Sequence, residues 1–351
     1  MDLSGKLLSA SAQAGPAPEF TRLLDLAAER LGGRALLAND EFFAPKENLL
    51  KLSKPVFIEN KYTGRGKWMD GWETRRRRTA GHDWCILRLG AEGIVRGVDV
   101  DTSFFTGNYP EAVSIDALSF PGRPAAKRLA AAPWIEILPK SPLRGGSHNY
   151  FAIPRGGPWT HLRVNIYPDG GVARLRAYGE AVFRPGRGAA SRKAVDLAAA
   201  QNGAWIISAS DRFFGSPENM LMPGRAKNMG EGWETKRRRG PGHDWAVVRL
   251  AHPGTIEKIE IDTNHFKGNC PESFLLEGLM GSDPSAVQGA AWTLVLPRTK
   301  LKPHSRRLFA KEIADRGPFS HARLSIYPDG GISRLRIYGR PLAAPGIRKA
   351  P

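Results

Sequence analysis

Cysteine is scarce in this sequence of 351 residues, which contains only Cys85 and Cys270. Two unpaired thiols fit a reducing compartment and argue against a fold held together by disulfides. The first twenty residues hold no continuous apolar segment of the kind that a secretion signal needs. No apolar run is long enough to span a bilayer. We therefore expect a cytoplasmic protein with no membrane partner.

Several motifs that define large classes of enzyme are also absent. There is no His-x-x-x-His pair and no Cys-x-x-Cys pair of the kind that binds zinc. There is no Gly-x-x-x-x-Gly-Lys loop for phosphates and no Gly-x-Ser-x-Gly nucleophile turn. We predict no cofactor, and the sequence leaves open whether a divalent metal takes part.

Acidic residues are the minority charge, with 34 Asp and Glu against 52 Lys and Arg, which gives a net charge of +18. Such an excess favours an anionic partner, either a nucleic acid or a small carboxylate or phosphate. The charge is spread over the whole chain and accompanies no recognised nucleic-acid motif. We therefore expect a small-molecule partner and no nucleic acid.

The sequence contains an internal duplication. Residues 71–84 return as 232–245, residues 101–111 return as 262–272, and residues 161–179 return as 321–339. This period is much longer than that of a solenoid repeat, so it indicates a duplicated domain. We predict a first domain at 1–183 with a short N-terminal extension, a linker at 184–192, and a second domain at 193–351 with a short C-terminal tail. An insertion at 51–67, present in the first copy alone, is predicted to be a surface loop.

Short runs of alternating apolar residues dominate both copies. Leu162, Val164 and Ile166 alternate with polar residues, which is the period of a half-buried strand. The turn sequence 168–171 and a second alternating run follow, so we predict a hairpin there with glycine at positive φ. Gly32 and Gly203 are predicted to end helices. Many short strands with glycine and proline between them predict an all-β sandwich in each copy.

Arginines stand at the centre of the best-preserved block. Arg75 to Arg78 and Lys236 to Arg239 lie between Gly-Trp-Glu-Thr and Gly-His-Asp-Trp in both copies. A charge run alone usually indicates a solvated loop. A guanidinium is also the natural clamp for a carboxylate. Both interpretations stay open for this run.

Other repeated polar residues carry similar alternatives. His82 is suited either to general acid–base chemistry or to a structural hydrogen bond. His161 is either a substrate ligand or the partner of an exposed carboxylate. Asn108 is either a substrate ligand or a turn former. Arg163 is either a substrate ligand or the partner of an exposed carboxylate. Trp72 and Trp84 are predicted to be core residues.

Taken together, the repeated blocks Gly-Trp-Glu-Thr-x-Arg-Arg-Arg, Gly-His-Asp-Trp and Asp-Thr-x-x-Phe-x-Gly-Asn-x-Pro-Glu resemble the allantoicase family. The resemblance covers the chain from about Asp25 to Gly339. It implies two tandem jelly-roll β-sandwich domains of the galactose-binding-like type. It also implies a hydrolase of the allantoin and purine degradation route that converts allantoate and water to ureidoglycolate and urea. We further expect a homo-oligomer. The rival hypothesis is a non-catalytic tandem β-sandwich that binds carbohydrates or anions.

Under this resemblance the repeated polar residues receive expected roles. The expected catalytic residues are His82, Asp101, Glu73, His243, Asp262 and Glu234, with the histidines as acids and the aspartates as bases. The expected substrate-binding residues are Arg76, Arg77, Arg237, Arg238, Asn108, Asn269, Glu111, Glu272, Arg163 and Arg323. Ser103 and Phe104 face Asn264 and His265 in the other copy, so the two copies need not hold equivalent sites.

Overall fold

The computed structural model describes residues 7–9, 16–120, 122, 124–154, 157–184, 194–281 and 291–342. The chain divides into two compact units, Met1–Val182 and Phe183–Pro351, which we call half one and half two. Except for Arg184, the predicted linker at 184–192 lies outside the described residues, and so does the predicted tail beyond Leu342.

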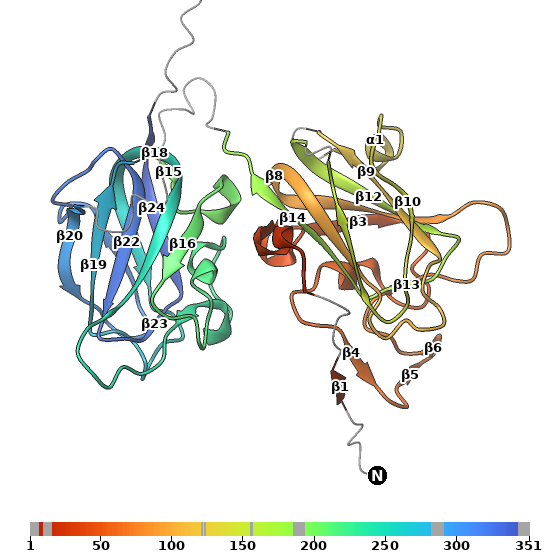
Figure 1. The fold of residues 1–351 in the computed structure, drawn as a ribbon, viewed down its shortest axis with the longest axis horizontal. Coiled ribbons are helices and arrows are strands. Elements are labelled where there is room, and N and C mark those ends of the chain that lie inside the picture. Colours follow the sequence, from red (N-terminus) through yellow and green to blue (C-terminus); the bar gives the residue numbers. More distant parts are fainter. Residues whose placement is uncertain are drawn as a thin grey trace, which may run out of the picture. The chain divides into compact units, whose positions relative to one another are not determined.

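Strands make up most of the regular secondary structure of half one (Figure 1). They are β1 (Leu7–Ser9), β2 (Leu24–Asp25), β3 (Arg34–Ala38), β4 (Val56–Ile58), β5 (Tyr62–Thr63), β6 (Gly66–Lys67), β7 (Trp72–Glu73), β8 (Asp83–Asp101), β9 (Ala112–Leu118), β10 (Ile135–Pro142), β11 (His148–Ala152), β12 (Trp159–Tyr167), β13 (Gly171–Val172) and β14 (Arg174–Ala181). One short α-helix, α1 (Ala126–Ala130), and 3-10 helices at Glu19–Arg22, Glu29–Leu31 and Lys46–Leu50 complete it.

Half two repeats this order. Its strands are β15 (Val195–Asp196), β16 (Trp205–Ala209), β17 (Trp233–Glu234), β18 (Asp244–Asp262), β19 (Ser273–Leu279), β20 (Thr293–Lys300), β21 (Arg306–Phe309), β22 (Phe319–Tyr327), β23 (Gly331–Ile332) and β24 (Arg334–Pro341). Its 3-10 helices are Ala200–Asn202, Pro217–Leu221 and Met229–Glu231.

The long strand β8 belongs to both layers of half one. Its first part pairs with β3 and β12, and its second part pairs with β11 and β14. The change occurs at Gly93, which is in register with both Trp159 and Ala181. A Cβ atom at Gly93 would lie 2.6 Å from the carbonyl oxygen of Glu180, so only glycine fits this crossing. Gly254 has the same place in β18.

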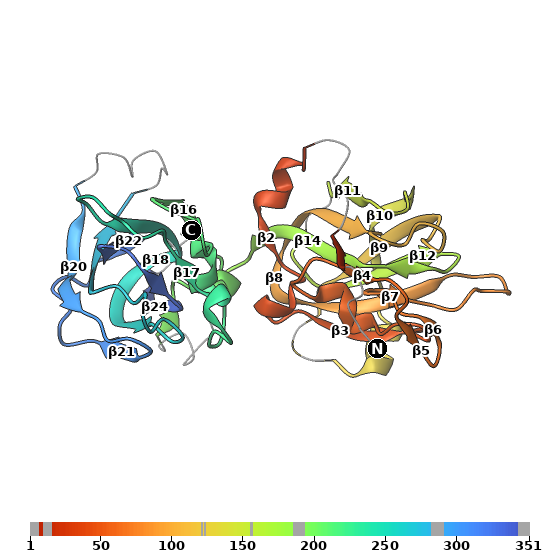
Figure 2. The same cartoon turned by 90° about the horizontal axis from the view of Figure 1, so that it is seen from below.

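The strand order is β10-β9-β12-β8-β14-β2 in half one and β20-β19-β22-β18-β24-β15 in half two, with eight strands in each connected sheet. Figure 2 gives a second view of both sheets. The prediction of two tandem jelly-roll β-sandwich domains from an internal duplication is confirmed.

The core follows the predicted alternation. Leu162, Val164 and Ile166 are fully buried on β12, as are Val98 and Val100 on β8. Trp72 and its counterpart Trp233 are also fully buried, whereas Trp84 and Trp245 are half-buried. Burial of these aliphatic faces between two layers supplies the main driving force for each half.

The predicted hairpin across residues 168–171 is wrong. β12 and β14 do not pair with each other, because β8 lies between them in the sheet. Residues 168–173 instead carry the chain between the layers, and β13 pairs with β7 on the way. Gly170 does have the predicted positive φ, at 134°. Alternation identifies a half-buried strand but not its partner, which is why the sequence pattern failed here.

Two other local predictions have different outcomes. Gly32 and Gly203 end 3-10 helices in the left-handed conformation, as predicted. The insertion at 51–67, predicted as a surface loop, contains the short strands β4, β5 and β6. β5 and β6 pair with each other, and β4 pairs with β1.

His161 is fully buried on β12, and its Nδ1 lies 2.8 Å from Thr160 Oγ1. Desolvation, aided by the charge of Arg88, lowers the pKa of His161 to about 4. The unfolded chain therefore binds a proton between about pH 6.5 and 4 that the folded chain does not. We expect the free energy of unfolding of half one to fall as the pH is lowered through this window.

The slope attributable to His161 is at most about 1.4 kcal/mol per pH unit. Denaturant titrations of the full chain at several pH values measure it. His161→Gln removes the titrating group, so it is expected to flatten the slope of the half-one transition. An identical slope in the variant would contradict this source of acid sensitivity.

Candidate active site

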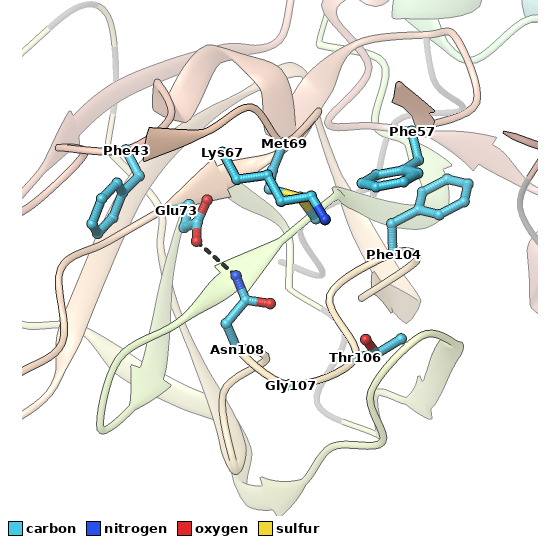
Figure 3. A pocket seen from close by; sticks show the side chains of 9 residues that line it. All are labelled: Phe43, Phe57, Lys67, Met69, Glu73, Phe104, Thr106, Gly107 and Asn108. Atoms are coloured by element: carbon cyan, nitrogen blue, oxygen red, sulfur yellow. Dashed lines mark hydrogen bonds between the residues drawn. The ribbon is translucent and has the colours of Figure 1, made fainter. Parts of the chain in front are cut away.

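Half one contains a cavity of about 530 Å³ at the end of the sandwich where β7 and β13 pair. This volume falls in the range of roughly 300–1,000 Å³ that is usual for small-molecule sites. It is lined by Phe43, Phe57, Lys67, Met69, Glu73, Phe104, Thr106, Gly107 and Asn108 (Figure 3). We call it the half-one cavity.

Glu73 is held in this cavity by backbone pairing on both sides. β7 pairs with β13, so Glu73 is in register with Gly171. On its other side, the backbone N–H of Glu73 donates to the carbonyl of Ala44 at 3.2 Å. Its neighbour Trp72 is fully buried and donates its indole N–H to the carbonyl of Asp40 at 2.8 Å. The Glu73 carboxylate therefore stands on a rigid support.

Asn108 reaches Glu73 from the loop that follows β8. The backbone N–H of Gly171 donates to the carbonyl of Asn108 at 2.8 Å, which fixes the loop beside β13. The side-chain amide of Asn108 then donates to Glu73 Oε1 at 2.6 Å. Figure 3 shows the amide oxygen of Asn108 turned away from Glu73. One carboxylate oxygen of Glu73 is thus bound by the amide.

The burial of Glu73 changes its acidity. Desolvation raises the pKa of this carboxyl group, and the hydrogen bond from Asn108 opposes the rise only in part. A carboxylate with a raised pKa is a better proton acceptor at neutral pH than an ordinary glutamate. The site is therefore suited to general base chemistry.

Phenylalanines and one lysine form the opposite wall. The rings of Phe57 and Phe104 are stacked with centroids 5.9 Å apart. Phe104 has a positive φ of 68°, and its neighbour Phe105 is fully buried against Gly171. The ammonium of Lys67 lies 4.7 Å from the centroid of Phe57. The cavity thus combines a carboxylate, an amide, an ammonium and an apolar wall.

Half two repeats the carboxylate–amide pair. Asn269 donates its side-chain amide to Glu234 Oε1, and the backbone N–H of Gly331 donates to the carbonyl of Asn269 at 2.9 Å. His265 takes the place of Phe104 with a similar positive φ of 73°, and its Nε2 lies 3.0 Å from the carbonyl oxygen of Ala226. The pair is therefore common to both halves, while its surroundings differ.

The repeated arginine frame has a structural explanation. Arg77 forms an ion pair with the buried carboxylate of Asp83 at 2.8 Å, and its backbone N–H donates to Asp169 at 2.7 Å. Arg238 makes the equivalent contacts with Asp244 and Asp329. These bonds tie the arginine loop of each half to the first residue of the following strand and to the turn after β12 or β22. Arg76 and Arg237 are exposed beside them, and none of the four lines the half-one cavity.

His82 lies against an aromatic ring. It packs on Tyr167 with centroids 4.7 Å apart, and His243 packs on Tyr327 at 4.6 Å. Desolvation and nearby arginines lower the pKa of His243. His82 does not line the half-one cavity. The structure therefore does not bring His82 to Glu73 and Asn108, and its role as an acid stays a prediction.

Asp101 and Asp262 lie at the ends of the long strands and are nearly inaccessible, at 2% and 1% exposure. Asp101 accepts a hydrogen bond from the backbone N–H of Ser103 at 2.8 Å, and Asp262 accepts the same bond from Asn264. Each carboxylate thus shapes the loop that follows its strand. The predicted role of these aspartates as bases stays a prediction.

The remaining predicted ligands lie on other surfaces. Arg163 pairs with Asp116 at 2.9 Å, and Arg323 pairs with Glu277 at 2.7 Å. Glu111 and Glu272 are exposed at the starts of β9 and β19. Glu272 pairs with Arg298. None of these side chains lines the half-one cavity.

Sequence reasoning missed most of the cavity wall. Phe57, Lys67 and Met69 come from the segment around the insertion, which has no counterpart in the second copy. The sequence signal for this segment is its position directly before the repeated Gly-Trp-Glu-Thr block, which contains Glu73. Repetition between the copies identifies only residues that both copies share, so it does not identify a segment present in one copy.

Within the described residues, no group of three or more His, Cys, Asp or Glu side chains is placed to hold a metal ion. No helix in the described ranges is long and apolar enough to cross a membrane.

The fold and this site define a class: a duplicated jelly-roll β-sandwich with a carboxylate–amide pair in each copy. The family described as "Allantoicase repeat" matches residues 24–182 and 195–342. The chain belongs to the allantoicase family, a family of hydrolases. The rival hypothesis of a carbohydrate- or anion-binding module is not favoured.

Individual relatives agree with the family match. The chain is 50% identical over 329 residues to "Probable allantoicase 1" of Burkholderia mallei, covering 92% of this chain and 96% of that protein. It is equally identical to "Probable allantoicase" of Ralstonia nicotianae, with the same coverage. The crystal structure of allantoicase from Saccharomyces cerevisiae matches with a TM-score of 0.76 at 35% identity, covering 91% of this chain and 93% of that one.

Proposed function

We propose that this chain hydrolyses allantoate to ureidoglycolate and urea in allantoin degradation, and that the half-one cavity is where the reaction occurs. The main support is the position of Glu73. Its carboxylate has a raised pKa, is bound by Asn108 and faces a cavity of a size usual for small-molecule sites. We further propose that the chain is a homo-oligomer and that it acts in the cytoplasm. Its expected partner is the small-molecule substrate.

The chemistry fits the groups present. Allantoate has a central carbon that carries one hydrogen, a carboxylate and two ureido groups. Hydrolysis breaks the bond from this carbon to one ureido nitrogen, and the oxygen of water forms the new bond. Glu73 takes a proton from the water and returns a proton to the departing urea nitrogen. The amide oxygen of Asn108 accepts a hydrogen bond from the substrate.

We assign the base to Glu73 rather than Asp101 on exposure and hydrogen bonding. Asp101 is buried and already accepts the Ser103 N–H, so it has little access to substrate. Glu73 is half-buried, lines the cavity and has one oxygen bound by Asn108. Glu234 with Asn269 is the corresponding pair of half two.

Urea release from allantoate by the purified full chain, with and without a chelator, tests the function. Release in both conditions would support hydrolysis by side chains alone. Release that the chelator abolishes would support the reaction and add a metal to it. No release in either condition, even after divalent metal is restored, would overturn the proposal.

The pH dependence of kcat/KM tests the role of Glu73 specifically. We expect the rate to fall at acid pH through a pKa above the ordinary glutamate value of about 4.3. The hydrogen bond from Asn108 stabilises the charged form of Glu73, so Asn108→Leu is expected to move this limb to higher pH. The matched variant Asn269→Leu is expected to leave it in place. An acid limb that Asn108→Leu does not move would contradict the assignment.

A further inference from the structure

Lys67 is the one cation among the nine described residues that line the half-one cavity. No ion pair of the described residues includes it, and its ammonium lies against the Phe57 ring instead. Figure 3 shows Lys67 and Glu73 both facing the cavity, Lys67 toward the Phe57 and Phe104 pair and Glu73 toward Asn108. Lys67 is exposed, and a positive charge with no carboxylate partner beside a cavity is available to bind an anionic group of the occupant.

The arginines expected to bind the substrate carboxylate have other partners or positions. Arg77 is bound to Asp83, and Arg163 is bound to Asp116. Arg76 is exposed and does not line the cavity. Of the cations considered, Lys67 alone faces the space beside Glu73.

From this geometry we infer that Lys67 binds the carboxylate of the substrate and thereby selects ureido acids over neutral ureido compounds. The inference rests on the proposed function, because it places allantoate in the half-one cavity. It also gives the insertion at 51–67 a role, as the segment that supplies the anion-binding group of half one.

The insertion is fixed well enough to position Lys67. At its near end the guanidinium of Arg174 donates to the carbonyl of Ser53 at 2.9 Å and to the Asp70 carboxylate at 2.6 Å. Asp70 also accepts the backbone N–H of Val56 and pairs with Lys51. At its far end β6 pairs with β5, and Arg65 in the turn between them donates to the carbonyl of Phe42 at 2.8 Å, which joins this hairpin to another segment of half one. Lys67 therefore extends from an anchored strand and not from a free loop.

Half two has a cation at another position. The insertion has no counterpart there, but Lys267 occupies the place of Thr106, which lines the half-one cavity. Each copy thus has a lysine in a segment that corresponds to the wall of the half-one cavity, at different sequence positions. Lys267 provides a matched control for charge removal in the half where we do not place the reaction.

A fixed carboxylate has a stereochemical consequence. The two ureido groups of allantoate are enantiotopic, so the group that departs decides which enantiomer of ureidoglycolate forms. Lys67 at the carboxylate, Glu73 at the departing ureido group and the cavity wall around the remaining groups define the three points that distinguish them. Loss of Lys67 is therefore expected to lower the enantiomeric excess of the product as well as the affinity.

Steady-state kinetics of Lys67→Met with allantoate test the inference. Loss of a charge-assisted contact is expected to raise KM by roughly tenfold or more, with kcat changed by less than about threefold. Lys67→Arg keeps the charge and is expected to recover most of the affinity. Lys61→Met removes a charge from the same insertion, where Lys61 lies over Trp68, and is expected to leave KM unchanged. Lys267→Met is expected to do the same.

A neutral probe separates charge recognition from structure. The primary amide of allantoate, used as a competitive inhibitor, is expected to bind wild type and Lys67→Met equally. An unchanged KM for allantoate in Lys67→Met would overturn the inference. Equal weakening of acid and amide would also overturn it, because Lys67 would then only shape the cavity.

The failure of the proposed function is a different result. If wild type releases no urea, the proposed reaction is wrong. If kcat is unaffected in Glu73→Gln, the proposed role of Glu73 is wrong. If wild type releases no urea, calorimetric titration with hydantoate, a stable ureido acid, makes the same comparison. Tighter binding by wild type than by Lys67→Met would support the anion site, and equal binding would overturn it.

Discussion

Glu73→Gln is expected to lower kcat for allantoate hydrolysis by about 10²- to 10⁴-fold, the usual contribution of a positioned acid or base. Glutamine has the same shape and still meets the Asn108 side chain, so the cavity persists while the proton acceptor is lost. KM is expected to change little, because the substrate carboxylate is bound elsewhere. Initial rates of urea release with saturating allantoate measure the effect.

Glu234→Gln is the matched control for this experiment. It makes the same change in the same backbone frame, where Asn269 binds Glu234 as Asn108 binds Glu73. Half two lacks the insertion and has His265 in place of Phe104, so we expect a much smaller loss of kcat. An equal loss in the two variants would contradict a reaction confined to half one. No loss in Glu73→Gln would remove Glu73 from the chemistry.

Arg174→Met is expected to destabilise half one by about 3–5 kcal/mol, the usual cost of leaving a buried charge without its partner. Arg174 is 1% exposed and donates to the Asp70 carboxylate and to the carbonyls of Ser53, Asp70 and Ala173. Burial alone would raise the pKa of Asp70, but Arg174 and Lys51 lower it below the ordinary value. The carboxylate is therefore charged, and removal of Arg174 leaves it buried with only the more exposed Lys51 beside it.

Denaturant unfolding of the full chain, followed by tryptophan fluorescence, measures the change in the half-one transition. Arg96→Met is the control, because both members of its ion pair with Glu180 are exposed, at 45% and 54%. That variant is expected to cost about 1 kcal/mol or less. Equal destabilisation by the two variants would contradict the claim that burial of Arg174 sets the difference. A folded Arg174→Met chain is further expected to bind allantoate more weakly, since the insertion loses its anchor.

The fold was largely predictable from the sequence because its signals are local or repeated. Alternation along 162–166 identified β12, and the second copy identified each element again. The wrong prediction at 168–171 was that the strands on either side of this turn pair with each other. Strand partners in a jelly roll are set by packing between distant segments, and no local pattern distinguishes a hairpin from a crossing between layers. The structure shows that crossing, with β13 beside β7.

The site was predictable only in part, for a related physical reason. Repetition identified Glu73 and Asn108, which the structure places 2.6 Å apart at Oε1 and Nδ2. The same criterion selected Arg77, whose repeated contacts are those of a structural clamp with Asp83. Repetition reports any shared constraint, so it does not separate folding from chemistry. The comparison of the two copies could not identify Lys67 as a site residue, because Lys67 occurs in one copy and is brought to the same cavity as Glu73 only by folding.

A crystal structure of the Glu73→Gln chain with allantoate tests the account most directly. We predict allantoate in the half-one cavity, with its carboxylate at Lys67 and one ureido group between Asn108 and the substituted side chain at position 73. Allantoate bound instead against His82 and Arg76, with the half-one cavity empty, would contradict the account and restore the roles first expected for those residues.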